Sequence, residues 1–415
     1  MSDAIPPTDK KDRGPLLALL TANVISQIGN TMAMLAIPWF VLTTTGSASS
    51  TAITVAVGTL PVVISGVFGG AIVDRLGYKP SSIVSDLASG TTMILIPILH
   101  GTIGISLGQL LVLVFLGALL DAPGSSARRS LYPELAGRAG ITLERANAGY
   151  SMSNRLASML AAPAGGIIIA VLGAPNLLYL DAATFFVSAG IVATRVPSAI
   201  DVPSEQTSGG IRRYLRDVRE GFLFLHRDRI LSWLVISFAA GSLLAEPVYG
   251  VILPVYTQER YGDAVNLGLI FGALAIGSLI GNVIYATLSH RITRRRMFLG
   301  GFLVRGLAFT VLVFVPPWWV IALAIFVGAI ALEPINPLSM TMMQERVPPG
   351  MRGRAFSAGA AVQACALPIG LVVYGSLLDG IGTSATLALF VVVNLAFPAW
   401  LCVVPALRSL DDQPA

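Results

Sequence analysis

The chain has 415 residues, of which 54% are hydrophobic and only 12% are charged. A soluble globular protein carries about 25% charged residues, because its surface faces water. This composition therefore excludes a cytosolic enzyme, a nucleic-acid binder and a disordered scaffold. The net charge of +5 would suit a nucleic-acid partner, but the positions of the charges point to a membrane topology. Both cysteines, Cys365 and Cys402, lie in apolar stretches, so we expect no disulfide framework.

Twelve apolar runs are long enough to cross a bilayer, which takes roughly 20 residues of helix. The first six runs cover about residues 15–42, 50–73, 82–99, 105–127, 146–172 and 176–195, and the second six cover about residues 230–256, 265–288, 297–315, 317–342, 355–378 and 384–406. The first run is too long for the core of a cleaved leader and contains polar residues, so we interpret it as a helix. The sequence thus predicts an all-α membrane protein with twelve transmembrane helices.

The basic residues give this topology its orientation. With the N-terminus in the cytoplasm, nearly all of the 27 lysine and arginine residues fall in cytoplasmic segments. Only Arg260 falls outside, while Arg155 and Arg305 lie within spans. Since Lys and Arg accumulate in cytoplasmic loops, we expect both termini in the cytoplasm. The excess of arginine over lysine is typical of a GC-rich bacterial genome, so we expect a multi-pass protein of the bacterial cytoplasmic (inner) membrane.

The longest polar gap divides the chain into an N-terminal six-helix bundle (residues 1–195), a cytoplasmic linker (residues 196–229) and a C-terminal six-helix bundle (residues 230–415). From Ile211 onward, apolar residues and arginines occupy opposite faces at helical spacing. This pattern predicts an amphipathic helix on the inner membrane surface, with a regulatory docking site as the alternative. A weak repeat relates Asp121 and its nearby Pro123 to Glu333 and Pro334. Duplicated halves predict two pseudo-symmetric bundles that rock about a central site.

The stretch Gly70–Lys79 contains the pattern G-x-x-x-D-R-x-G. It resembles the loop 2–3 signature of the major facilitator superfamily, with Tyr78 in place of a basic residue. The stretches Glu144–Ala148, Leu180–Phe186 and Arg352–Arg354 are similar to the branch of macrolide-efflux proteins and enterobactin exporters, which are drug:proton antiporters. The resemblance covers nearly the whole chain and implies the major facilitator fold, transport driven by a proton gradient, and no cofactor.

The resemblance also implies a gate at the cytoplasmic ends of the helices. Its candidate residues are Asp74, Arg75, Gly77, Asp86 and Asp121. We expect their charges to form a network that latches the two halves when the inner mouth closes, and a static ion pair is the alternative. Glu333 with Arg291 or Arg294 would form the weaker counterpart in the second half.

Glu246 is the first candidate for proton coupling. At 1.5 Å per residue it lies roughly 24 Å from the inner end of its span, too deep for its charge to reach the inner surface. Burial disfavours the ionised carboxylate, which suits a group that loads and releases protons. Tyr249 shares its helical face, and Pro247 frees a backbone carbonyl nearby. A fixed, hydrogen-bonded or salt-bridged glutamate is the alternative. Asp181 is the second candidate, although its place near the outer end of a span favours hydration and a structural role.

The substrate cavity is expected between the two bundles. Asn23, Gln27 and Asn30 recur at i, i+4 and i+7 and form one polar stripe on the first span. Polar stripes can instead hold helices together. The other candidate cavity residues are Arg155, Tyr249, Glu333, Asn336 and Gln363.

These observations predict a secondary transporter and not an enzyme. The sequence has no phosphate-cradling G-x-x-x-x-G-K-[ST] motif and no Cys/His cluster, so we expect neither ATP nor a metal. We expect a monomer in membrane lipid that exports amphipathic small molecules, drugs or secreted metabolites, in exchange for protons by alternating access. Siderophore export or metabolite uptake by the same fold is the first alternative. A non-transporting membrane receptor or assembly protein, or a membrane-embedded enzyme, is the alternative from another class.

Overall fold

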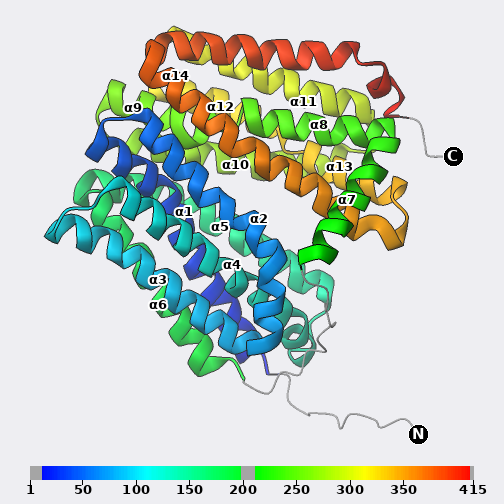
Figure 1. Cartoon of the computed structure of the whole chain (residues 1–415). Coiled ribbons are helices and arrows are strands. Elements are labelled where there is room, and N and C mark those ends of the chain that lie inside the picture. The colour runs from blue at the N-terminus through cyan, green and yellow to red at the C-terminus, as the bar shows by residue number, and fades with distance from the viewer. Residues whose placement is uncertain (1–11, 198–210, 412–415) are drawn as a thin grey trace, which may run out of the picture.

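The computed structural model describes residues 12–197 and 211–411. Every regular element in these ranges is helical (Figure 1). The first helical group comprises α1 (Gly14–Thr45), α2 (Ala48–Leu76), α3 (Tyr78–Thr102), α4 (Leu107–Arg138), α5 (Leu143–Leu172) and α6 (Ala174–Arg195). After α7 (Ile211–Arg227), the second helical group comprises α8 (Arg229–Leu244), α9 (Leu253–Tyr261), α10 (Val265–Leu288), α11 (Arg294–Phe309), α12 (Trp318–Leu332), α13 (Ile335–Arg346) and α14 (Arg352–Val403).

Ten helical segments of the described chain are long and apolar enough to cross a membrane. The last of them contains α14, which has 52 residues and turns sharply at Gly382, where φ is 79° and ψ is 167°. Glycine adopts this positive φ without the steric penalty of a side chain, so the helix runs as two arms joined at one residue. The all-helical membrane fold is thereby confirmed, while the count of twelve crossings and the cytoplasmic position of the termini stay predictions.

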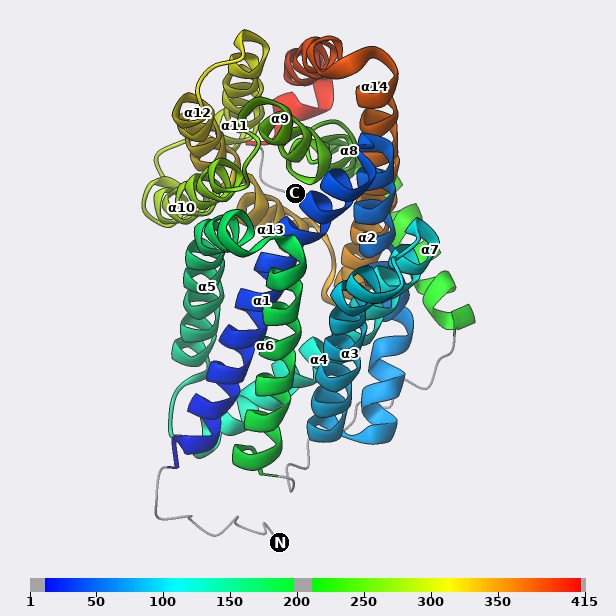
Figure 2. The same cartoon turned by 90° about the vertical axis from the view of Figure 1, so that its left-hand side faces the viewer.

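The two helical groups are separately packed and meet along two seams. Within the first group α1 packs on α5 and α6, and within the second α10 packs on α12. Between the groups, α2 lies along α14 and α5 lies along α10 (Figures 1 and 2). The amphipathic helix expected within the linker 196–229 does form, as α7, and it packs against α14. Residues 198–210 of that linker lie outside the described ranges.

Glycines bring the backbones of the seams into contact. A Cβ atom on Gly166 of α5 would lie 2.6 Å from the carbonyl oxygen of Ala264 and 2.9 Å from the Cα atom of Gly268, so neither glycine has room for a side chain. On the other seam, a Cβ atom on Gly375 would lie 3.0 Å from the carbonyl oxygen of Ala48. Small residues allow such close approach of helices in membranes. Both contacts lie toward the predicted outer ends of the helices, so the groups are closed at that end.

Asp379 ties the seam between α2 and α14 together. Its carboxylate accepts hydrogen bonds from the backbone N–H groups of Ala48 at 2.8 Å and Ser49 at 2.9 Å, and from the hydroxyl of Ser47 at 2.8 Å. These donors form the N-terminus of α2, where a negative charge also interacts favourably with the helix dipole. A side chain of the second group therefore caps a helix of the first.

We predict that Asp379→Ala loosens the outer closure, because α2 loses its cap from the other group. A cysteine placed at Val55, which faces Gly250 of the second group, reports the opening in a background with Cys365 and Cys402 changed to serine. Its rate of labelling by a membrane-impermeant maleimide from outside should rise several-fold.

The matched control is Ser106→Ala. Ser106 accepts from the backbone N–H of Gln109 at 3.3 Å and so caps α4 within its own group, at the same predicted outer end. Equal labelling rates in the two variants would show that Asp379 does not hold the groups together.

Candidate transport site

Two Glu-Pro dipeptides interrupt helices of the second group. Glu246 and Pro247 follow the end of α8 and precede a short π-helical turn, Val248–Ile252, that leads into α9. Glu333 and Pro334 separate α12 from α13. Proline has no N–H to donate, and its ring clashes with the carbonyl of the preceding turn, so a helix breaks there. Each break carries a glutamate in the middle of an otherwise apolar stretch.

Glu246 lies beside a buried arginine of α11. Its Oε1 atom is 4.0 Å from Nη1 of Arg305, and the exposed fractions of the two side chains are 42% and 5%. The guanidinium carbon also lies 5.3 Å from the ring centre of Phe302 and 5.9 Å from that of Phe309, distances at which a ring face attracts a cation. Sequence analysis missed this pairing, because nothing in the spacing relates positions 246 and 305.

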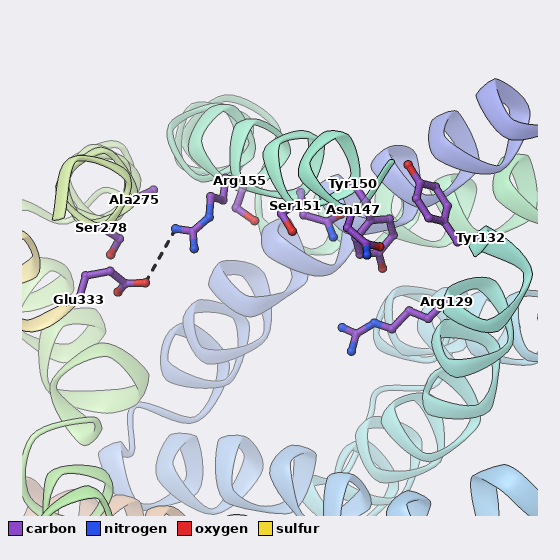
Figure 3. Close-up of a pocket in the computed structure, with 11 residues that line it drawn as sticks. Arg129, Tyr132, Asn147, Tyr150, Ser151, Arg155, Ala275, Ser278 and Glu333 are labelled. Atoms are coloured by element: carbon purple, nitrogen blue, oxygen red, sulfur yellow. Dashed lines mark ion pairs between the residues drawn. The ribbon is translucent and has the colours of Figure 1, made fainter. Parts of the chain in front are cut away.

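Glu333 connects the two helical groups. Its Oε1 atom lies 3.8 Å from Nη1 of Arg155 on α5 (Figure 3). The same oxygen accepts a hydrogen bond of 2.8 Å from the Nδ2 of Asn282. The expectation that Glu333 pairs with Arg291 or Arg294 is wrong. Arg294 begins α11 and pairs instead with Glu345 at 2.6 Å. Glu345 lies in the last turn of α13, a helix of 12 residues, whereas Glu333 precedes the start of that helix.

The Arg155–Glu333 pair lies in a cavity of about 670 Å³ between the groups. The cavity is lined by α4 and α5 on one side, and by α10 with Glu333 on the other (Figure 3). Its lining extends to Arg129 and Asn147, near the predicted cytoplasmic ends of α4 and α5. Since the groups touch at the opposite end, the cavity opens toward the predicted cytoplasmic side.

A second cavity of about 460 Å³ lies between Thr59 of α2 and helices α8, α13 and α14. Its walls are mostly apolar, and the large side chains among them are Phe238, Met340, Met343 and Phe356. The predicted cavity residues Asn336 and Gln363 both line it. The residues that line the first cavity are mostly polar and those that line the second are mostly apolar, so the two together suit a molecule with both kinds of surface.

The predicted polar stripe of α1 is mostly used to hold helices together. Asn23 is 7% exposed, donates to Oδ1 of Asn154 at 2.6 Å and accepts from the hydroxyl of Tyr150 at 3.3 Å. Gln27 donates to the hydroxyl of Ser158 at 3.3 Å. The cavity-lining prediction is therefore wrong for Asn23, because α5 packs on this face of α1 and its polar side chains bond to the stripe.

Asp86 and Asp121 are connected through Arg128. Nη1 of Arg128 lies 2.6 Å from Asp86, and Nη2 lies 3.9 Å from Asp121. Ser188 donates to the other oxygen of Asp86 at 2.7 Å, and Asn30, which lines a cavity with Asp121, donates to it at 3.5 Å. This network lies inside the first group and not between the halves, because α4 continues to Arg138 and places Arg128, expected in a loop, on a buried helical face.

The remaining predicted residues have different surroundings. Gly77 has φ 85° and joins α2 directly to α3, while the side chains of Asp74 and Arg75 lie outside those that the structure describes. Asp181 is 0% exposed, so the expected hydration is wrong: it faces Gly29 of α1, where a Cβ atom would lie 2.5 Å from its Oδ1. Tyr249 packs edge-to-face on Phe271 with ring centres 6.1 Å apart. No cluster of His, Cys, Asp and Glu suited to a metal ion occurs among the described residues.

We predict that Arg128→Met destabilises the protein by about 3–5 kcal/mol, because it leaves the buried Asp86 charge without its partner. Arg138→Met is the matched control on the same helix. Arg138 pairs with Glu134 four residues earlier, with both side chains 43% exposed, and such exposed pairs contribute about 0–1 kcal/mol. Thermal unfolding of the two purified variants in detergent measures the difference, and equal losses would contradict a special role of burial.

Comparisons with known proteins identify the family of this chain. The family described as transmembrane secretion effector matches residues 15–414. The multidrug efflux pump Tap of Mycolicibacterium fortuitum is 33% identical over 402 residues, which cover 96% of this chain and 98% of Tap. Macrolide efflux protein A of Streptococcus pyogenes is 20% identical over 366 residues, 87% of this chain and 88% of that protein. The enterobactin exporter EntS of Escherichia coli is 26% identical over 330 residues, 77% of this chain and 73% of EntS.

Solved structures share the fold at low sequence identity. A bacterial homologue of the iron transporter ferroportin in its inward-facing state superposes with a TM-score of 0.74 and 18% identity, covering 96% of this chain and 98% of that one. The nucleoside transporter NupG gives a TM-score of 0.73 and 12% identity, covering 96% and 99%. The expected resemblance is confirmed: the chain belongs to the transmembrane secretion effector family of the major facilitator superfamily.

Proposed function

We propose that this chain exports amphipathic small molecules, drugs or secreted metabolites, across the bacterial inner membrane in exchange for protons. The observation that carries the proposal is the pair of glutamates at helix breaks, each within 4.0 Å of an arginine. Glu333 also lines the cavity between the two groups. Ionisable side chains at membrane depth are costly and mark ion and substrate pathways. The similarity to multidrug efflux pump Tap supports efflux as the direction.

Glu246 is the proposed proton carrier. Its side chain is 42% exposed and its carboxylate can therefore exchange protons with water, while buried Arg305 stays in place among the aromatic rings. Ionised Glu246 is attracted to Arg305, and protonation removes that attraction. The protonation state of Glu246 thereby sets whether the break at Pro247 is tied to α11, which is the two-state behaviour that coupling requires. Asp181, buried with neither carboxylate oxygen hydrogen-bonded among the described residues, is the second proton site in this proposal.

Alternating access would follow from rocking of the halves 1–195 and 230–415, with residues 196–229 as the tether. In the proposed inward-facing state, the groups are held together at the outer end, where Asp379 caps α2. In the outward-facing state, Asp74, Arg75 and Gly77 would latch the inner end of the same seam. Twelve crossings are supported by the ten candidate spans, by the second arm of α14 and by α2, a helix of 29 residues. An even number places both termini on one side, and the distribution of Lys and Arg favours the cytoplasmic side.

A single proton per cycle is sufficient for useful accumulation. Moving one charge through 100 mV yields about 2.3 kcal/mol, and one pH unit adds about 1.4 kcal/mol. Together these support a gradient of several hundredfold in a neutral substrate. One carboxylate that carries one proton therefore meets the energetic requirement.

The first experiment measures proton flux in proteoliposomes on addition of macrolides, tetracyclines, cationic dyes and siderophores. We expect wild type to respond to at least one compound and Glu246→Gln to lose the response, because an amide cannot carry a proton. Glu345→Gln, which removes an exposed partner of Arg294 at the predicted cytoplasmic end, is the control and should keep it.

Retained flux in Glu246→Gln would exclude Glu246 and direct attention to Asp181. Binding without flux in wild type, together with no counterflow of labelled compound, would favour a receptor over a carrier. A wild-type response to siderophores alone would select the siderophore-export alternative.

The pair that bridges the groups gives a second test. Arg155→Glu places a carboxylate beside Glu333 and should lower the transport rate at least tenfold by repulsion. The double variant Arg155→Glu with Glu333→Arg restores opposite charges, and Asn282 can turn its amide oxygen toward the new guanidinium. We therefore expect the exchange to recover a substantial part of the rate in counterflow assays. A double variant as inactive as the single one would refute a role for the pairing itself.

A further inference from the structure

The break beside Glu246 leaves a backbone carbonyl without its usual donor. In a regular helix, the carbonyl of residue 244 accepts from the N–H of residue 248. Here the N–H of Val248 donates to Ala245 at 3.1 Å, and the N–H of Glu246 reaches back to Gly241 at 3.2 Å. The carbonyl of Leu244 therefore needs a donor from elsewhere, since buried backbone acceptors are almost always paired.

Asn394, on the second arm of α14, supplies that donor. Its Nδ2 atom lies 3.1 Å from the carbonyl oxygen of Leu244 and 2.9 Å from that of Phe390 in its own helix. The side chain is only 5% exposed. The amide group thus joins the end of α8 to the neighbouring arm of α14.

The same residue also fixes the position of the helix that carries Arg305. A Cβ atom on Gly306 would lie 2.5 Å from the carbonyl oxygen of Asn394, so α11 rests directly on the backbone of α14 at this residue. Phe309, which lies beside the Arg305 guanidinium, contacts Phe390 one turn before Asn394, with ring centres 5.1 Å apart. Asn394 is therefore the point at which the Glu246 break and the Arg305 helix are both held.

We propose that Asn394 is a positioning residue that sets the separation of Glu246 and Arg305, and through it the protonation of Glu246. The inference rests on the proposed function of Glu246 as the proton carrier. Without the Asn394 donor, the end of α8 is free to shift against α14 while Arg305 stays on α11. A Glu246 carboxylate farther from the guanidinium is protonated more readily.

The test compares wild type with Asn394→Leu, which has a similar size and no donor. Purified protein in detergent with the transported compound gives the pH midpoint of compound-induced proton release, and proteoliposomes give the maximal rate and the apparent KM. We expect the midpoint to move by at least half a pH unit toward higher pH and the maximal rate to fall at least fivefold, with KM within twofold of wild type. Thr386→Val is the control and should leave all three values unchanged, because among the described residues the buried Thr386 bonds only to the carbonyl of Gly382 in its own helix.

Two further variants keep the inference testable if Asn394→Leu does not fold. Asn394→Gln keeps the donor and should recover most of the wild-type midpoint, whereas Gly306→Ala pushes α11 off the Asn394 carbonyl and should shift the midpoint. Wild-type midpoints in Asn394→Leu, or in Gly306→Ala where the Leu variant is lost, would overturn the inference. Retained flux in Glu246→Gln would instead overturn the proposed role of Glu246 as proton carrier, so the two failures are distinguishable.

Discussion

In the described part of the chain, the arginines inside the helical bundle lie opposite acidic side chains, and the arrangement of the helices depends on that pairing. Taking an ion out of water is expensive, and a partner with good geometry offsets the cost. Arg128 therefore lies 2.6 Å from Asp86 inside the first group, and Arg155 reaches Glu333 across the groups at 3.8 Å. The first pair is short and buried, which suits a fixed structural contact. The second pair is longer and partly exposed to solvent, which suits a contact that breaks and re-forms.

The contacts that close the outer end have a different physical basis. Between α5 and α10, Gly166 and Gly268 bring backbone against backbone, with no side chain between them. Between α2 and α14, one carboxylate caps a helix N-terminus of the opposite group. Flat glycine surfaces and one ionic cap can separate without unfolding either group. This makes them suitable for a closure that opens and re-forms in every transport cycle.

The second group carries the broken helices. Proline after glutamate at 246 and 333 interrupts the hydrogen-bond pattern where a carboxylate must respond to its surroundings. A broken helix has carbonyls that other elements must satisfy, and Asn394 does so for Leu244. The proposed proton site at Glu246 and the Asn394 contact that supports it thus belong to the same helix break. The first group, with helices that continue through their prolines, provides the opposing wall.

Composition and the spacing of apolar runs were sufficient to predict an all-helical membrane protein, because lipid imposes the same requirement on every spanning segment. The motif around Asp74 identified the superfamily, and the isolated acids Glu246 and Glu333 were recognisable because charge is rare in such runs. The partners of those acids were decided only by the tertiary structure. Arg305 and Asn394 lie far from Glu246 in sequence and are brought to it by helix packing. Asn23 packs against α5. The sequence could not show this, because the spacing of polar residues on one helix does not identify the helix that covers them.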